Sequence, residues 1–85
     1  MELNQLRIFR VLAETKSYTR AAKQLFVSHS SVSRAVSALE AELGVTLVER
    51  DNRVIGLTEA GKRLLERSEE LLMLADEIEN EVRNI

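Results

Sequence analysis

The most regular pattern of apolar and polar positions lies between residues 19 and 43. Its first part predicts a short helix with the apolar residues Ala21, Ala22 and Leu25. Its second part predicts a helix over residues 29–43, with apolar residues four, three and four apart at Val32, Val36, Leu39 and Leu43. Residues 26–28 allow only a tight corner between them, and Ser28 is a suitable N-cap. Small alanines let the two helices cross closely, which is the layout of a helix-turn-helix.

Another helix is predicted over residues 3–15. Its apolar stripe consists of Leu3, Leu6, Phe9 and Ala13, with Leu12 beside it. Residues 16–18 interrupt the pattern, and Thr19 is expected to cap the helix that follows. Tyr18, the only tyrosine, is interpreted as a packing residue rather than a chemical one.

A two-stranded hairpin is predicted after the 29–43 helix. Gly44 is expected to end that helix, because glycine adopts the left-handed conformation found just past many helices. Residues 45–48 and 54–57 are apolar and rich in β-branched side chains, which predicts two short strands around a polar turn at residues 49–53. A hairpin in this place makes a winged helix, and packing on the helices would stabilise so small a hairpin.

The last pattern is helical from Thr58 to the end of the chain. A heptad seam runs through Leu64, Ser68, Leu71, Ala75, Ile78, Val82 and Ile85. A helix of 28 residues is about 42 Å long, so its far half is expected to pair with a second chain. The predicted dimer interface comprises Leu64, Leu65, Leu71, Leu72, Ala75, Ile78, Val82 and Ile85. The alternative for Leu64 and Leu65 is that they pack back onto their own domain.

The predicted fold class is therefore mainly α, a winged helix-turn-helix of three helices and a two-stranded wing followed by a long helix. We expect a winged helix-turn-helix domain at residues 1–57 and a linker and dimerisation helix at residues 58–85. A chain of 85 residues holds one small domain. The heptad seam still continues at Ile85, so we expect this chain to be the N-terminal piece of a longer protein.

The net charge of −2 hides an asymmetry along the chain. Residues 1–57 hold eight basic and six acidic side chains, whereas residues 58–85 hold four basic and eight acidic ones. From Thr15 to Leu39 there is no acidic residue, and the basic residues there are Lys16, Arg20, Lys23 and Arg34. A locally positive surface is what contact with phosphate needs. A solvated helix face is the alternative for Lys16 and Lys23.

The polar face of the 29–43 helix carries the side chains best suited to enter a DNA groove. This face consists of Ser30, Ser33, Arg34, Ser37 and Ala41. Serine is a poor helix former, so its repeated use makes sense if the face must be slim and carry hydroxyl groups. Arg34 can pair bidentately with guanine or clamp a phosphate. The alternative is a solvent-facing surface without a partner.

Three further residues are candidates for DNA contact. His29 is the only histidine and has neither a carboxylate at ligand spacing nor a nucleophile nearby, which favours a base or phosphate contact over metal binding or catalysis. Arg53 at the hairpin tip is placed for the minor groove, where negative potential attracts arginine. Arg50 has the alternatives of pairing with a neighbouring acidic residue or supporting the wing from beneath.

Composition argues against several other classes of protein. The absence of cysteine rules out a disulfide framework and a thiolate metal site, and it suits a reducing cytoplasm. There is no run of 18 apolar residues and no signal-like N-terminus, so we expect a cytoplasmic protein without a membrane partner. No catalytic constellation is present, so we expect no enzyme, and no cofactor or metal in this domain.

Residues 1–62 closely resemble the N-terminal domain of LysR-type transcriptional regulators. The resemblance rests on MELNQLRIFRVLAE, on SYTRAAKQLFVSHSSVSRAVSALEAELGVTLVER and on GLTEAG. It implies a winged helix-turn-helix whose linker helix pairs two subunits on promoter DNA, and a tetramer of the full-length protein. It also implies a C-terminal effector-binding domain, absent from this chain, and only there is a small-molecule effector expected.

Together, these observations predict sequence-specific binding of double-stranded DNA by a homodimer that reads an inverted repeat. The 29–43 helix is expected in the major groove and the wing near Arg53 in the minor groove. The predicted DNA-binding residues are Thr19, Arg20, Ser28, His29, Ser30, Ser33, Arg34, Ser37, Arg50 and Arg53. The alternative is a winged-helix protein-interaction module whose long helix recruits a partner. The acid-free, serine-lined face counts against it, since protein interfaces favour aromatic residues.

Overall fold

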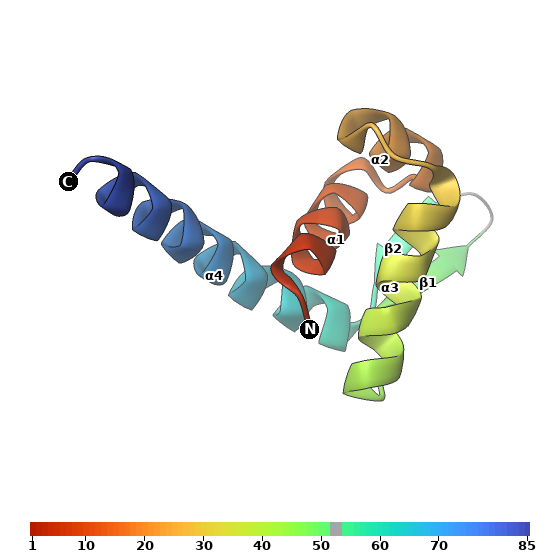
Figure 1. The fold of residues 1–85 in the computed structure, drawn as a ribbon. Coiled ribbons are helices and arrows are strands. Elements are labelled where there is room, and N and C mark those ends of the chain that lie inside the picture. The colour runs from red at the N-terminus through yellow and green to blue at the C-terminus, as the bar shows by residue number, and fades with distance from the viewer. Residues whose placement is uncertain (52–53) are drawn as a thin grey trace.

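Three helices, a two-stranded hairpin and a long fourth helix follow one another along the chain (Figure 1). The computed structural model describes the backbone of residues 1–51 and 54–85 and the side chains of residues 1–49 and 55–85. The elements are α1 (Leu3–Thr15), α2 (Tyr18–Leu25), α3 (His29–Leu43), β1 (Val48–Asp51), β2 (Val54–Leu57) and α4 (Glu59–Arg83). The predicted fold class, a winged helix-turn-helix followed by a long helix, is confirmed.

Helix α1 is the central element, because α2, α3 and α4 all pack against it. Leu6, Phe9 and Leu12 are at most 1% exposed, as predicted, whereas Leu3 of the same predicted stripe is 43% exposed. Ile8 and Val11 are buried as well, although they lie outside that stripe. A helix covered on several sides needs apolar residues around more of its circumference than a surface helix does.

The helix ends follow local capping chemistry. Ser28 caps α3, and its hydroxyl oxygen accepts a hydrogen bond from the Ser31 amide at 3.1 Å, as predicted. Gly44 ends α3 with a left-handed φ of 68°, also as predicted. The predicted cap of α2 was wrong: Ser17, not Thr19, accepts the hydrogen bond from the Arg20 amide, and Thr19 lies inside the helix. The helix begins earlier because Lys16, in a left-handed conformation, already closes α1.

The hairpin pairs β1 and β2 antiparallel, with Val48 opposite Leu57 and Asp51 opposite Val54. The second strand lies at residues 54–57 as predicted, but the first begins at Val48 instead of Val45. The β-branched residues before Val48 have no partner strand, because β2 ends at Leu57 and the chain turns into α4 at Thr58. The Thr58 amide and hydroxyl instead donate to the carbonyl oxygens of Leu47 and Thr46.

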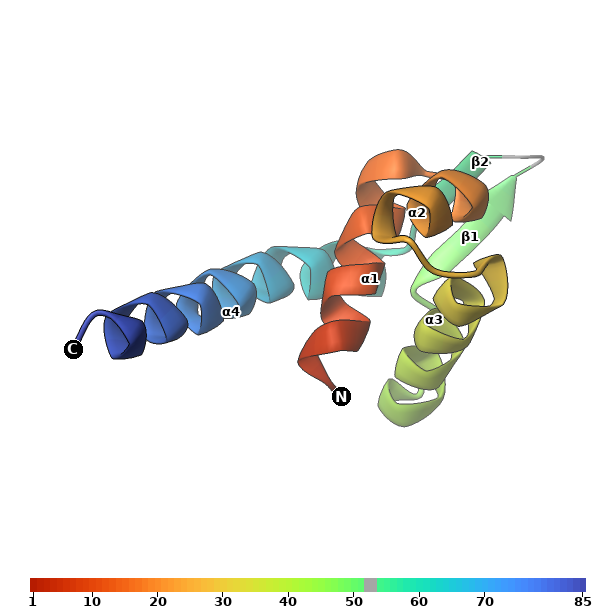
Figure 2. The ribbon, with the colours of Figure 1, turned by 45° about the horizontal axis from the view of Figure 1, so that its top comes forward.

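Helix α4 packs against the other helices as far as Asp76. Leu72 is fully buried in the common core, and Arg7 of α1 lies 3.6 Å from the carboxylate of Asp76. Beyond this point the helix extends away from the domain, so the C-terminus and the hairpin lie at opposite ends of the molecule (Figures 1 and 2). Leu72, which was predicted in the dimer interface, is instead covered by its own domain, as is Ser68, the polar position of the heptad seam.

We expect replacement of Ser68 by alanine to stabilise the protein. Ser68 is 2% exposed, and its hydroxyl finds no hydrogen-bond partner in the part of the chain that the structure describes. Removing a buried unsatisfied hydroxyl should raise the free energy of unfolding by about 1 kcal/mol. Thermal unfolding of Ser68→Ala measures this, and Ser37→Ala, at an exposed helical serine, corrects for helix propensity. Equal gains in both variants would contradict the expectation.

Candidate nucleic-acid interface

The exposed face of α3 is slim and polar, as the sequence predicted. Ser30, Arg34 and Ser37 are exposed and Ser33 is half-buried, while Val32, Val36 and Leu39 on the opposite face are buried in the core. The buried residues hold the helix against α1 and α2. The outward face therefore presents short hydroxyl side chains around one long guanidinium group, a shape that fits into a groove about 12 Å wide.

The N-terminus of α3 is organised by three serine hydroxyl groups. The Ser28 oxygen lies 3.1 Å from the Ser30 oxygen and 2.9 Å from the Ser31 oxygen. The Ser28 hydroxyl is thus already engaged as the helix cap. Ser28 therefore serves first to begin the helix, and the exposed Ser30, which does not cap the helix, remains a candidate for ligand contact.

The N-termini of α2 and α3 lie side by side. The rings of Tyr18, which opens α2, and His29, which opens α3, are 5.3 Å apart between centroids. Tyr18 is half-buried and packs on the core, as expected, while His29 is exposed. The positive ends of two helix dipoles therefore meet at this point, and such ends favour a phosphate oxygen.

Positive side chains surround these two helix ends. Thr19 and Arg20 are exposed in the first turn of α2, and Arg34 is exposed one turn into α3. None of the ion pairs found among the described residues involves Arg20, Lys23 or Arg34. Because there is no acidic residue between Thr15 and Leu39, this surface is locally positive and suited to attract a polyanion.

The wing contributes two predicted residues that the structure places only in part. Arg50 lies in β1, opposite Ile55, but its side chain is outside the described part of the chain. Arg53 at the predicted tip lies wholly outside the described residues. Their roles stay predictions.

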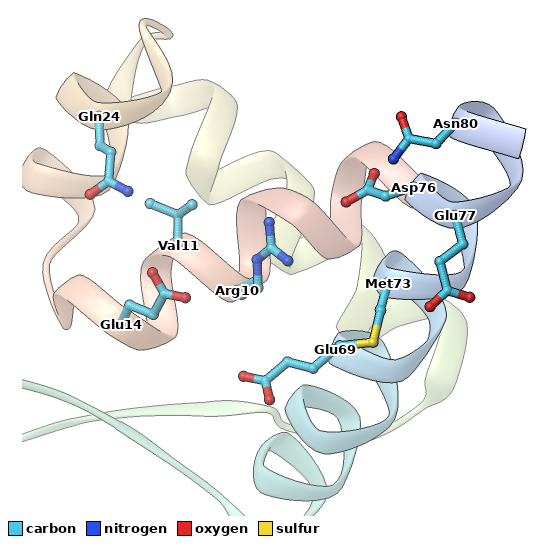
Figure 3. A pocket seen from close by; sticks show the side chains of 9 residues that line it. All are labelled: Arg10, Val11, Glu14, Gln24, Glu69, Met73, Asp76, Glu77 and Asn80. Carbon is cyan, nitrogen blue, oxygen red and sulfur yellow. The ribbon is translucent and has the colours of Figure 1, made fainter. Parts of the chain in front are cut away.

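A groove between α1, α2 and α4 has the opposite electrostatic character (Figure 3). It has a volume of about 530 Å³, and Arg10 is its only basic lining residue. The acidic side chains that line it are Glu14, Glu69, Asp76 and Glu77. Carboxylates repel phosphate, so a nucleic acid is expected at the α2–α3 surface and not in this groove.

The predicted dimer residues of α4 fall into two groups. Leu64 and Leu65 pack partly against the core of their own chain, which was the alternative for them, and Leu72 is fully buried there. The remaining residues form a stripe along the outer side of α4, which consists of Leu71, Ala75, Ile78, Val82 and Ile85. Leu71 is 40% exposed and Val82 64% exposed. This outer stripe has nothing within the described chain to cover its far half.

Phe26 has an unusual backbone conformation in the corner between α2 and α3, which the spacing of apolar residues does not predict. It is 95% exposed and left-handed, with φ 57° and ψ 41°, and its amide donates to the Lys23 carbonyl at the end of α2. This conformation costs an L-residue about 1–2 kcal/mol. The left-handed conformation at Phe26 ends α2 and turns the backbone toward α3, so the corner between the two helices requires it.

Replacing Phe26 with glycine should therefore stabilise the protein by about 0.5–1 kcal/mol, the relief of backbone strain less the added freedom of the unfolded chain. The exposed ring contributes little burial that could be lost. Urea unfolding measures the effect. Val27→Gly is the matched control, because Val27 has a negative φ and should only lose stability. A loss of stability in Phe26→Gly would overturn the interpretation.

The described part of the chain contains neither a membrane-spanning helix nor a cluster of metal ligands. No helix there is both long enough and apolar enough to span a membrane. No group of three histidine, cysteine or acidic side chains there is arranged to hold a metal ion.

Comparison with known proteins places the chain among regulators. A model described as bacterial regulatory helix-turn-helix protein, lysR family, matches residues 3–62. A probable RuBisCO transcriptional regulator of Trieres chinensis is 48% identical over 75 residues, which are 88% of this chain and 24% of that protein. The HTH-type transcriptional regulator CatR of Pseudomonas putida is 46% identical over 80 residues, which are 94% of this chain and 27% of CatR. The chain thus spans about a quarter of the length of these relatives.

Two crystal structures share the fold over its whole length. The CbnR DBD in complex with DNA has a TM-score of 0.93 and 43% sequence identity, covering 99% of this chain and 97% of that one. The BenM DBD in complex with catB site 1 DNA has a TM-score of 0.95 and 34% identity, covering 100% and 94%. The family model covers most of the sequence, and the shared architecture extends through α4. The chain therefore belongs to the lysR family of bacterial regulatory helix-turn-helix proteins.

Proposed function

We propose that the chain binds double-stranded DNA in a sequence-specific manner, as the DNA-binding part of a LysR-type transcriptional regulator. The observation that carries this proposal is the acid-free surface on which the N-termini of α2 and α3 meet beside Arg20 and Arg34. The similar CbnR and BenM domains are found in complexes with DNA, which supports the same use here.

The residues of this surface divide into two roles. The helix N-termini, with Thr19, Arg20 and Ser30, suit phosphate oxygens and would set the position of the domain on the duplex. Ser33, Arg34 and Ser37, further along α3, suit base edges in the major groove, where Arg34 can pair bidentately with guanine. The wing near Arg53 would reach the neighbouring minor groove. Because Arg34 is the one long cationic side chain on α3, spacing and DNA shape would add to specificity.

We further propose that two copies pair through the outer stripe of α4 in antiparallel orientation. Residues 59–67 carry three basic and two acidic side chains, whereas residues 68–83 carry one basic and six acidic ones. Parallel pairing would bring the two acidic halves together, and antiparallel pairing brings each acidic half toward the partner's more basic one. A two-fold dimer presents two copies of α3 to DNA and therefore reads an inverted repeat. Tetramer formation by a full-length protein is proposed from the family resemblance.

Arg34→Ala tests the base-reading role. We expect a loss of about 1–3 kcal/mol on a selected specific duplex and a smaller loss on random duplex, measured by fluorescence anisotropy. Lys23→Ala is the matched control, since Lys23 is an exposed basic residue of α2 and should weaken binding equally on all duplexes. If Arg34→Ala also weakens both duplexes equally, Arg34 contacts phosphate and does not read a base.

The competing function is a protein-interaction module in which α4 recruits a partner. The exposed apolar stripe of α4 would suit it, but it leaves the basic α2–α3 surface without a role. Titration of wild-type protein against DNA at two salt concentrations separates the two functions. A DNA-binding domain loses affinity steeply as salt rises, because each neutralised phosphate releases counterions.

A further inference from the structure

Glu40 joins α3 to the root of the wing. It is half-buried on the last part of α3, and one oxygen of its carboxylate accepts hydrogen bonds from the Leu47 amide at 2.8 Å and the Val48 amide at 3.4 Å. Val48 is the first residue of β1. In the described part of the chain these are the only hydrogen bonds between α3 and the hairpin or its root.

The same segment is held from its other side by the beginning of α4. The Thr58 amide donates to the Leu47 carbonyl at 3.0 Å, and the Thr58 hydroxyl donates to the Thr46 carbonyl at 2.6 Å. The side chain of Leu47 is 1% exposed in the core. Residues 46–48 therefore form a joint whose backbone is fixed to α4 by Thr58 and to α3 by Glu40.

The joint matters because Glu40 adds directional hydrogen bonds to what is otherwise apolar packing between α3 and the root of the hairpin. The backbone of β2 lies closest to α1 and α4, and Val48 and Leu57 pack against the common core to which α3 also contributes. In the chain, α3 and β1 are linked by four residues that begin with the left-handed Gly44. Without the Glu40 carboxylate, the orientation of the hairpin relative to α3 would depend on that short link and on the apolar packing of Leu47, Val48 and Leu57, which is not directional.

We propose that Glu40 is a positioning residue for DNA binding, which fixes the wing relative to α3 so that the two can enter adjacent grooves at once. This inference rests on the proposed function. A protein that makes two DNA contacts from one rigid body binds more tightly than one whose contacting parts move independently. Once the first contact has formed, the second costs no further loss of conformational freedom. Glu40 itself need not touch DNA, since its carboxylate already bonds backbone amides.

The direction in which DNA affinity changes when Glu40 is replaced distinguishes a positioning role from a purely electrostatic one. Glu40 lies on the helix proposed to enter the groove, and removal of a carboxylate near phosphate should by itself strengthen binding. The positioning role requires the opposite result. Glu42→Ala is the matched control, because it removes the same charge from the same helix, and the Glu42 carboxylate pairs only with the Met1 amine among the described residues.

The experiment compares wild type, Glu40→Ala, Glu40→Gln and Glu42→Ala by hydroxyl-radical footprinting and affinity on a selected duplex. Glu40→Ala should lose affinity by about ten- to a hundred-fold and lose protection in the flanking minor groove, while keeping protection over the half-site. Glu40→Gln should retain most of the affinity and of the flanking protection, because its amide oxygen can still accept a hydrogen bond from the Leu47 amide. Glu42→Ala should match the wild type.

Unchanged affinity and footprint in Glu40→Ala would overturn the proposal. Equal loss of half-site and flanking protection, together with lower thermal stability, would also overturn it, since Glu40 would then act on folding alone. If wild-type protein binds no duplex, the proposed function fails. The joint is then measured without DNA by residual dipolar couplings of β2 relative to α3. The couplings of β2 should be reduced by motion in Glu40→Ala but not in Glu42→Ala. Couplings of the same size in both variants would contradict the role of Glu40 in the joint.

Discussion

Replacing Gly61 with alanine is expected to destabilise the protein by about 3 kcal/mol, at the upper end of the usual effect of overpacking. A Cβ atom at this position would lie 2.1 Å from the Leu47 carbonyl oxygen and 3.1 Å from its carbonyl carbon. Both are backbone atoms of the joint that Thr58 and Glu40 hold, so they cannot move aside without breaking hydrogen bonds. For a chain of this size, such a loss lowers the midpoint of thermal unfolding by roughly 12–24 °C.

The sign of this effect is informative, because alanine in an ordinary helix position would stabilise by up to about 1 kcal/mol relative to glycine. Gly56→Ala is the control, since a Cβ atom there meets none of the described atoms within 4 Å and the φ of Gly56 is not left-handed. Circular dichroism during thermal unfolding measures both variants. A Gly61→Ala protein as stable as the wild type would show that α4 does not cross the 46–48 segment so closely.

Replacing Ile78 with glutamate is expected to dissociate the proposed dimer and to weaken binding to an inverted repeat by about a hundred-fold or more. Ile78 is 52% exposed in the single chain, so the stability of the monomer should hardly change. In an antiparallel pair the new charge would be buried at the centre of the outer stripe without a partner. Sedimentation equilibrium gives the oligomeric state, and a gel shift gives the affinity.

Met73→Glu is the matched control for this variant. It introduces the same charge on the same helix, but Met73 lines the acidic groove beside α1, on another side of α4. It should remain dimeric. If both variants stay dimeric, the outer stripe is not the interface, and if both dissociate, the groove side of α4 belongs to it as well.

The helices, both caps of α3 and strand β2 could be predicted from the sequence, because local spacing and capping chemistry determine them. Ser28 and Gly44 are examples, since each acts on residues within one turn of itself. The start of β1 could not be predicted from its own residues. The β-branched residues before Val48 suit a strand, but pairing ends where Thr58 turns the partner strand into α4.

The face of α4 that its own domain covers also depends on tertiary contacts. Apolar residues occupy two adjacent sides of this helix, and periodicity cannot say which side crosses α1. The structure buries the side with Ser68 and Leu72 and leaves the side with Leu71 and Ile78 exposed. Glu40 and Gly61 were missed for a similar reason, because both act on Leu47, 7 and 14 residues away. A glycine in the first turn of a helix, where it is costly, was the one available signal.

The most direct test of the account is binding of the wild-type chain to a duplex selected from a random pool, compared with a scrambled duplex, at 50 and 200 mM salt. We expect the selected duplex to bind at least about a thousand-fold more tightly than the scrambled one. Affinity for both should fall steeply at the higher salt, in proportion to the phosphates contacted. Equal affinity for the two duplexes, or affinity that does not change with salt, would contradict sequence-specific DNA binding through the basic α2–α3 surface.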